Sequence, residues 1–307
     1  MTEFLPEGRL SLQEDNTRVL NSPRLLHEAA AQGTILEARA VMCDAEHNLT
    51  VSLGCMKGFI PREEGAVGIR DGSVRDIAIL SRVNRPVCFT VTGFDKDKDG
   101  NELALLSREK AQRRCMEEYI SSLRKGDVID ARVTHLESFG AFADIGCGIV
   151  ALMPIDAISV SRIEHPKERF YTGMDIRAIV RSRENGRISL SHKELLGTWE
   201  ENAAQFCAGE TVSGIIRSVE PYGVFVELTP NLAGLAESRD GVAAGQQASV
   251  YIKSIIPDKM KIKLIIIDTF EDTCRAQPPV YFSEETHIER FLYSPQSCYK
   301  RIESIFS

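Results

Sequence analysis

The sequence has no long apolar run, and its single tryptophan stands at position 199. No stretch approaches the ~18 consecutive apolar residues that would indicate a membrane-spanning helix. The first 20 residues lack the basic start and the apolar block of a secretory signal. We therefore expect no membrane association and a cytoplasmic location.

The sequence contains cysteines, but their spacing does not indicate a metal site or a redox pair. The eight cysteines stand at positions 43, 55, 88, 115, 147, 207, 274 and 298, and none forms a CxxC pair. Free and mostly buried thiols are the simplest interpretation for an intracellular chain. Cys43, His47 and Cys55 could be metal ligands, but a fourth ligand is missing and the spacing fits no common zinc pattern. We expect no metal and no cofactor.

Catalytic motifs are also missing. The chain contains no P-loop, no GxSxG and no HExxH. The aspartates at 95, 97 and 99 match part of a calcium loop, but Leu106 stands where a glutamate would be required. A charged hairpin turn is the better interpretation. The sequence therefore predicts no catalytic residues, and we expect that the protein is not an enzyme.

Acidic residues outnumber basic ones, which gives a net charge of -7 over 307 residues. The excess lies in residues 1–32, 194–208 and 268–307, whereas the stretches between them are close to neutral. This balance excludes the strong overall positive field of a tight non-specific nucleic-acid binder. It still allows local basic faces, which would bind a polyanion with weak to moderate, salt-sensitive affinity.

Five short β-rich runs separated by turn signals lie between residues 126 and 193. They cover 126–133, 138–145, 150–154, 175–181 and 187–191. This pattern favours a small barrel. Strict alternation in the second run would place Phe139 and Phe142 on opposite faces. Gly140 makes a bend cheap at this point, and a bend would bring both rings toward one surface.

These residues resemble the S-one RNA-binding repeat, an OB-fold module of bacterial ribosomal protein S-one. The resemblance is carried by the segment 139–142, by Leu152 and by the run 186–191. In that family two aromatic residues of the second strand stack on bases, and a basic residue near the last turn meets the backbone. The resemblance therefore implies RNA binding by Phe139, Phe142 and Arg187. The family often has a histidine after the third strand, where this chain has Pro154.

The same pattern occurs earlier in the chain. At an offset of 93 residues, Gly33 matches Gly126 and the run 58–61 matches 151–154. Residues 33–107 therefore form a first copy. Its counterpart of the aromatic segment, at 46–49, contains no aromatic pair. We expect this degenerate copy to be a docking or scaffold module.

A third copy covers residues 209–267. At an offset of 83 residues, Tyr222 and Phe225 take the places of the two phenylalanines of the central copy. Its last hairpin carries three lysines that share strand parity and should therefore lie on one face. That face is either solvated or a phosphate track, and the adjacent rings favour the track. We predict RNA binding by Tyr222, Phe225, Lys259 and Lys261, with Lys261 in the place of Arg187.

The predicted fold class is mainly β, with three tandem five-stranded OB-fold barrels joined by short helices. The predicted domains are an N-terminal segment with a helix (1–32), a degenerate barrel (33–107), a linker helix (108–125), a central barrel (126–193), a second linker helix (194–208), a third barrel (209–267) and a C-terminal tail with a helix (268–307).

Three segments outside the barrels carry expectations of their own. Residues 1–21 are polar and are expected to be poorly ordered, and Ser22 is expected to cap a helix that ends at Gly33. Trp199 should pack against a neighbouring barrel. In the tail, Ser294 is expected to begin a helix with Tyr299, Ile302 and Phe306 on one side, docked on the last barrel or on a partner protein. The loop 159–172, with Arg169, is either a phosphate contact or a plain surface loop.

The pattern indicates a protein that holds single-stranded RNA, because rings stack on exposed bases and cations meet phosphates. The resemblance implies a role in translation on messenger RNA, with the small ribosomal subunit as a candidate partner. The alternatives are a protein-interaction scaffold and an accessory factor in RNA turnover or transcription.

Overall fold

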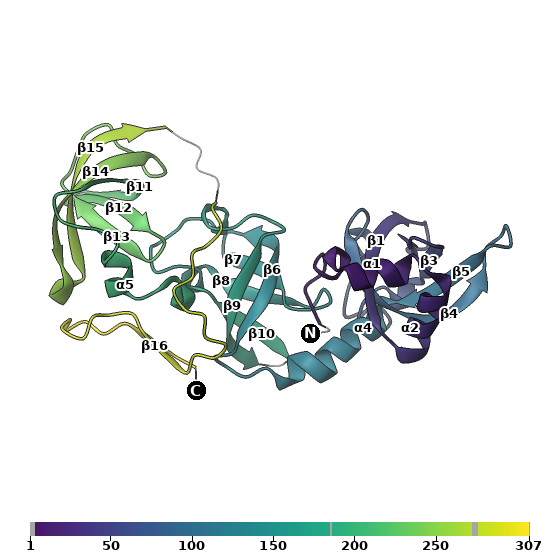
Figure 1. Cartoon of the computed structure of the whole chain (residues 1–307). Helices are drawn as coiled ribbons and strands as arrows, with labels where there is room; N and C mark the ends of the chain where they lie inside the picture. Colours follow the sequence, from purple (N-terminus) through teal and green to yellow (C-terminus); the bar gives the residue numbers. More distant parts are fainter. Residues whose placement is uncertain (1–3, 185, 272–275, 307) are drawn as a thin grey trace. The chain divides into compact units, whose positions relative to one another are not determined.

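The computed structural model describes residues 4–184, 186–271 and 276–306 and contains three closed five-stranded barrels (Figure 1). The first barrel consists of β1 (Ile35–Cys43), β2 (Leu49–Ser52), β3 (Lys57–Ile60), β4 (Pro86–Lys96) and β5 (Glu102–Ser107). The second consists of β6 (Val128–Glu137), β7 (Gly140–Asp144), β8 (Val150–Pro154), β9 (Asp175–Glu184) and β10 (Arg187–Ser191). The third consists of β11 (Thr211–Glu220), β12 (Gly223–Thr229), β13 (Leu232–Ala236), β14 (Gln247–Ile256) and β15 (Lys261–Phe270).

All three barrels have the same strand order. The first strand lies between the second and the fourth, and the third strand runs parallel to the fifth. This is the connectivity of the OB-fold, a small Greek-key barrel. The predicted fold class is therefore confirmed.

Side-chain size explains why each barrel closes at the same place. In the first and third barrels, a Cβ added at Gly58 or Gly234 would lie 2.4 or 2.5 Å from a leucine side chain of the fifth strand. That leucine is buried, as Leu106 and Leu264. The second barrel has Ala151 at the same position, also buried. A small residue on the third strand therefore lets the fifth strand fill the barrel interior.

The described chain forms two compact units. One holds Met1–Leu123 together with Asp130–Arg132 and Asp144–Val150, and the other holds the rest. In the first unit, α2 (Pro23–Gln32) begins and ends as expected, since the Ser22 side chain accepts a hydrogen bond from the Leu25 N–H and Gly33 has a left-handed φ of 64°. Cys274 and the other residues of 272–275 lie outside the described part.

The expectation that residues 1–21 are poorly ordered is wrong for residues 4–21, and residues 1–3 lie outside the described part. This segment contains α1 (Glu14–Leu20), and Leu20 packs into the core of the first barrel. Asn16 is buried and exchanges two hydrogen bonds of 2.9 Å with the backbone of Glu37. Polar composition suggested disorder, but these polar side chains find partners far along the chain.

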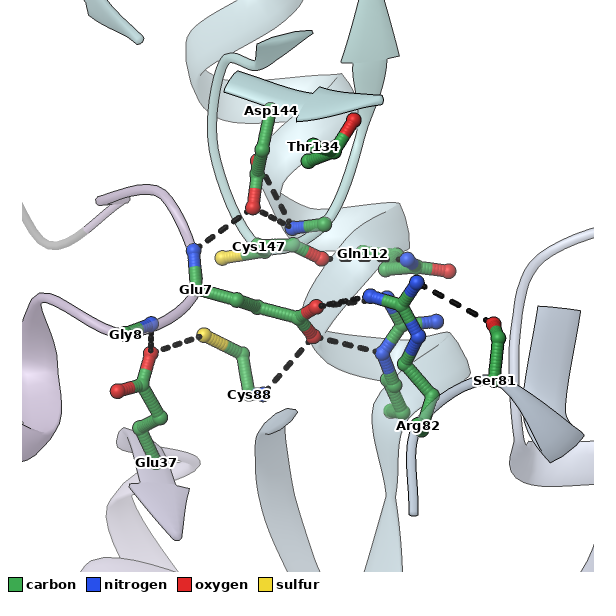
Figure 2. Close-up of polar contacts among 12 residues, drawn as sticks. Glu7, Gly8, Glu37, Ser81, Arg82, Cys88, Gln112, Thr134, Asp144 and Cys147 are labelled. Carbon is green, nitrogen blue, oxygen red and sulfur yellow. Dashed lines mark hydrogen bonds and ion pairs between the residues drawn. The ribbon is translucent and has the colours of Figure 1, made fainter. Parts of the chain in front are cut away.

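Glu7 is the main anchor of this segment (Figure 2). Its carboxylate accepts hydrogen bonds from Arg108 Nε at 2.7 Å and from Arg82 Nη1 at 3.2 Å, while its own N–H donates to Asp144 Oδ2 at 2.7 Å. Burial works to raise the pKa of Glu7, but Arg108, Arg82 and the Cys88 N–H together outweigh it, and the pKa lies below its ordinary value. Burial and the nearby Glu7 charge raise the pKa of Asp144 to about 8.

The linker helices are shorter than expected. After the first barrel, α4 (Arg108–Arg114) continues into one π turn and one 3-10 turn that ends at Ser122. After the second barrel, only α5 (Trp199–Ala203) is α-helical. Trp199 packs into the core of the third barrel, which confirms that expectation. One further short helix is α3 (Ile77–Leu80). Among the described residues, no helix combines the length and the apolar composition of a membrane span.

The predicted C-terminal helix is wrong. The tail instead forms a two-stranded hairpin of β16 (Arg290–Leu292) and β17 (Glu303–Ile305). Ile302 packs against the third barrel and Phe306 against a separate cluster with Ile179, while Tyr299 is 90% exposed. The apolar side chains therefore reach different places, and tertiary packing overrides the helical spacing.

Candidate nucleic-acid interface

Two aromatic pairs occupy equivalent positions in the second and third barrels with nearly the same geometry. The ring centroids of Phe139 and Phe142 are 6.0 Å apart with an interplanar angle of 89°, and those of Tyr222 and Phe225 are 6.2 Å apart at 88°. Phe139 and Tyr222 are 56% and 69% exposed, whereas the second ring of each pair is half-buried. Each pair thus offers one open ring face, supported at its edge by a fixed neighbour.

The backbone places the two rings on one side by a turn rather than by a bend within a strand. Phe139 and Tyr222 lie in the two-residue turns that precede β7 and β12. The expectation that both rings share a surface is borne out by the ring contact, but its expected cause, a bend inside the strand, is wrong. The exposed ring belongs to the turn and the half-buried ring to the strand.

The glycine between the rings has a different function. A Cβ at Gly140 would lie 2.4 Å from the carbonyl oxygen of Met153, and a Cβ at Gly223 would lie 2.5 Å from that of Ala236. Met153 and Ala236 are equivalent residues of the third strand. The glycine therefore lets the ring-bearing strand approach its neighbour closely, which a side chain would prevent.

Strand register also confirms the equivalence of Arg187 and Lys261. Ser189 is paired with Leu152 in the second barrel, and Lys263 is paired with Leu235 in the third. Arg187 and Lys261 each stand two residues earlier, at the start of the last strand. Both are exposed.

Three lysines of the third barrel lie on the same side of it, two on a strand and one in a turn. Lys261 and Lys263 alternate with the buried residues Ile262 and Leu264 along β15, as strand parity predicts. Lys259 lies instead in a 3-10 turn, Pro257–Lys259, just before that strand. Strand parity therefore does not explain the position of Lys259, but the turn places it beside the same groove as Lys261 and Lys263.

A groove of about 860 Å³ collects these groups, and we call it the lysine groove. Tyr222 and Phe225 line it, together with the buried Trp199 and Tyr293. Five lysines line it: Lys253, Lys259, Lys261, Lys263 and Lys300. Glu237 is its one carboxylate, at 3.9 Å from Lys253. Within the described chain, Lys259, Lys261, Lys263 and Lys300 make no ion pair.

The second barrel has a more mixed surface around its rings. His135 lies 6.3 Å from the Phe142 ring and is 2.6 Å from the Glu137 carboxylate. Arg187 stands opposite Glu184 in the hairpin. The structure thus joins Phe139 to Phe142, and it places Arg187 exposed at the start of β10.

The first barrel has neither part of the site. The ring positions are taken by Glu46 and Leu49, and Leu49 is fully buried. The position of Arg187 and Lys261 is taken by Leu103, because Phe59 pairs with Leu105 in the parallel register. No stacking platform or cation is available at this place.

Two residues differ from what the sequence suggested. Arg169 is buried, and its guanidinium contacts Ser159 Oγ at 3.3 Å and the Glu227 carboxylate, so it is neither a phosphate contact nor a plain surface residue. Lys300 lines the lysine groove although it lies in the tail, outside every repeat. Neither parity nor offset could identify it, since its position depends on how the tail packs.

Comparison with known proteins agrees with this geometry. Residues 122–193 match the S1 (S-one) RNA binding domain. The chain is 29% identical over 273 residues to small ribosomal subunit protein bS1 of Staphylococcus aureus (strain COL), covering 82% of this chain and 67% of that protein. It is 30% identical over 247 residues to the bS1 homolog of Bacillus subtilis (strain 168), covering 78% and 60%.

The bS1 protein of Rhizobium meliloti (strain 1021) is 29% identical over 245 residues, which is 74% of this chain and 42% of that protein. The chain therefore spans between 42% and 67% of the length of these relatives. The matched domain contains Phe139, Phe142 and Arg187. Residues 122–193 therefore form an S1 RNA binding domain, and most of the chain is similar to bacterial bS1 proteins.

Proposed function

We propose that this protein binds single-stranded RNA, and that it does so mainly through the lysine groove of the third barrel. One observation carries the proposal: two rings and five lysines share one groove in a chain whose net charge is -7. Clustered like charges repel one another, so such a groove is best explained by a polyanionic ligand. The exposed ring of Tyr222 supplies a platform for a base.

Base stacking and phosphate contacts determine the expected affinity and its dependence on salt. Stacking of a base on an aromatic ring contributes about 1–3 kcal/mol and tolerates any sequence. Four lysines without an ion pair would release counterions from about four phosphates, so the logarithm of the binding constant should fall with log salt with a slope of about -3. Rings on the second barrel add a second contact on the same strand, which raises avidity.

A fluorescence-anisotropy titration with a labelled oligouridylate tests this. Tyr222→Ala is expected to weaken binding by about 5- to 150-fold, the equivalent of one lost stacking contact. Phe139→Ala should weaken it too, by less if the second barrel is auxiliary. Phe270→Ala is a matched control, because that ring is 50% exposed at the far end of β15 and does not line the groove. Equal affinities for parent and Tyr222→Ala would refute the stacking role.

We further propose a role in translation, with messenger RNA and the small ribosomal subunit as partners and without catalysis. The support is the similarity to proteins named as small ribosomal subunit protein bS1. Co-sedimentation of the purified protein with small subunits on a sucrose gradient tests the partner. RNA recovered intact after prolonged incubation is the expected result for a non-enzyme, and cleavage would overturn that part.

A further inference from the structure

The C-terminal tail lies against the lysine groove because two of its residues are fixed there. Tyr293 is buried, its backbone carbonyl accepts a hydrogen bond from the Trp199 N–H at 3.0 Å, and its hydroxyl donates to the Asn231 carbonyl at 2.5 Å. Ile302 packs against the core of the third barrel. Both residues also line the groove.

The chain between these two anchors is a closed loop. The Tyr293 N–H donates to the Ile302 carbonyl at 3.0 Å, and the Ile302 N–H donates to Ser294 Oγ at 2.7 Å. A further turn is closed by the Cys298 N–H and the Pro295 carbonyl at 3.0 Å. The loop therefore has a defined path, and Lys300 is held next to an anchor.

Lys300 and its neighbour Arg301 have different environments. Lys300 lines the groove and makes no ion pair in the described part of the chain. Arg301 does not line it and lies 3.4 Å from the Glu303 carboxylate, which Arg290 also contacts at 2.7 Å. Among the described residues, Lys300 thus offers an unpaired positive charge to an anionic ligand in the groove, whereas the charge of Arg301 is paired with Glu303 outside it.

We propose that Lys300 and Ile302 of this loop form a second wall of the RNA groove and that Lys300 contacts a phosphate of the bound strand. This rests on the proposed function. A base stacked on Tyr222 leaves its phosphates between the lysines of β15 and Lys300. A groove with walls from two elements encloses a single strand, whereas a paired helix keeps its bases hidden from Tyr222. Because Lys300 contacts backbone and not base, its contribution is the same for every sequence.

The test uses the full chain and a fluorescein-labelled oligouridylate, with titrations at several salt concentrations. Lys300→Ala is expected to weaken binding about three- to tenfold and to reduce the steepness of the salt dependence by about 0.7, the contribution of one phosphate. Arg301→Ala removes the same charge from the next residue and should change neither quantity. A labelled oligoadenylate should show the same loss for Lys300→Ala.

The outcomes separate this inference from the function on which it rests. Binding that Tyr222→Ala weakens, with Lys300→Ala and Arg301→Ala indistinguishable, would overturn the second wall and leave the stacking groove intact. A parent protein that does not bind the oligonucleotide would overturn both. Lys300→Glu is a second variant, and it should weaken binding more than Lys300→Ala. Both changes are at an exposed site, so the fold should be kept, and circular dichroism checks it.

Discussion

Glu7→Gln should destabilise the first unit strongly although residue 7 lies near the start of the chain. The Glu7 carboxylate accepts hydrogen bonds from Arg108 Nε, Arg108 Nη2, Arg82 Nη1 and the Cys88 N–H, at 2.7, 3.1, 3.2 and 3.1 Å. The side chains of Glu7 and Arg108 are 5% and 4% exposed. The substitution keeps the shape but leaves the Arg108 guanidinium buried without its counter-charge.

The structure sets the magnitude. Removing one partner of a buried ion pair costs about 3–5 kcal/mol, because the other charge stays desolvated. At 1.36 kcal/mol per factor of ten, amide protection in the first barrel should fall about 2 × 10²- to 5 × 10³-fold. Hydrogen exchange followed by mass spectrometry suits this question, since it reports peptides of β1 and β4 separately from those of the third barrel.

A matched control removes an exposed carboxylate instead of a buried one. Glu28 forms an ion pair with Arg24 at 3.3 Å on α2, and both side chains are more than half exposed. Glu28→Gln should cost only about 0.3–0.5 kcal/mol. If peptides of β1 and β4 in Glu7→Gln exchange as slowly as in Glu28→Gln, the ion pair does not hold the segment and the reasoning is refuted.

Three further outcomes follow from packing and burial in the second unit. Trp199→Ala should cost about 3–5 kcal/mol in urea unfolding, because the indole fills the core of the third barrel; a loss below 1 kcal/mol would contradict that placement. Gly223→Ala should cost about 1–3 kcal/mol and weaken RNA binding, because a Cβ would meet a carbonyl oxygen at 2.5 Å; unchanged stability and affinity would show that the approach is not needed. His192 is fully buried, and burial lowers its pKa to about 4. The unfolded chain takes up the proton near pH 6.5 and the folded chain only near pH 4, so stability should be complete above pH 6.5 and fall by about 3 kcal/mol between these values. Urea midpoints of the second unit across that range measure it, because Asp144, whose raised pKa acts in the opposite direction, belongs to the first unit. His192→Gln should lose most of the pH dependence.

Local pattern was enough to predict the repeated barrels and the ring pairs. Alternation, turn residues and fixed offsets depend only on neighbours along the chain, and the strands follow them closely. The aromatic pairs could be predicted for the same reason, because a turn residue and a strand residue three positions apart meet whenever the hairpin forms. Lys261 was predicted to take the place of Arg187 in the last hairpin, and the register places it as expected.

Local sequence pattern was not sufficient to predict the structure of the two terminal segments. Glu7 is ordered by Arg108, 101 residues further along the chain, and no local feature of residues 1–21 indicates this. The tail shows the opposite error. Its apolar spacing fits a helix, but Ile302 packs against the third barrel and Phe306 packs in a different cluster, and two short strands allow both contacts.

Residues close together along the chain are sufficient to predict three copies of one barrel and the two copies that carry exposed rings. The place of Lys300 in the groove and the contact of Glu7 with Arg108 depend on the folded chain. Those contacts join residues separated by whole domains, and their energies depend on burial, which no spacing along the chain specifies.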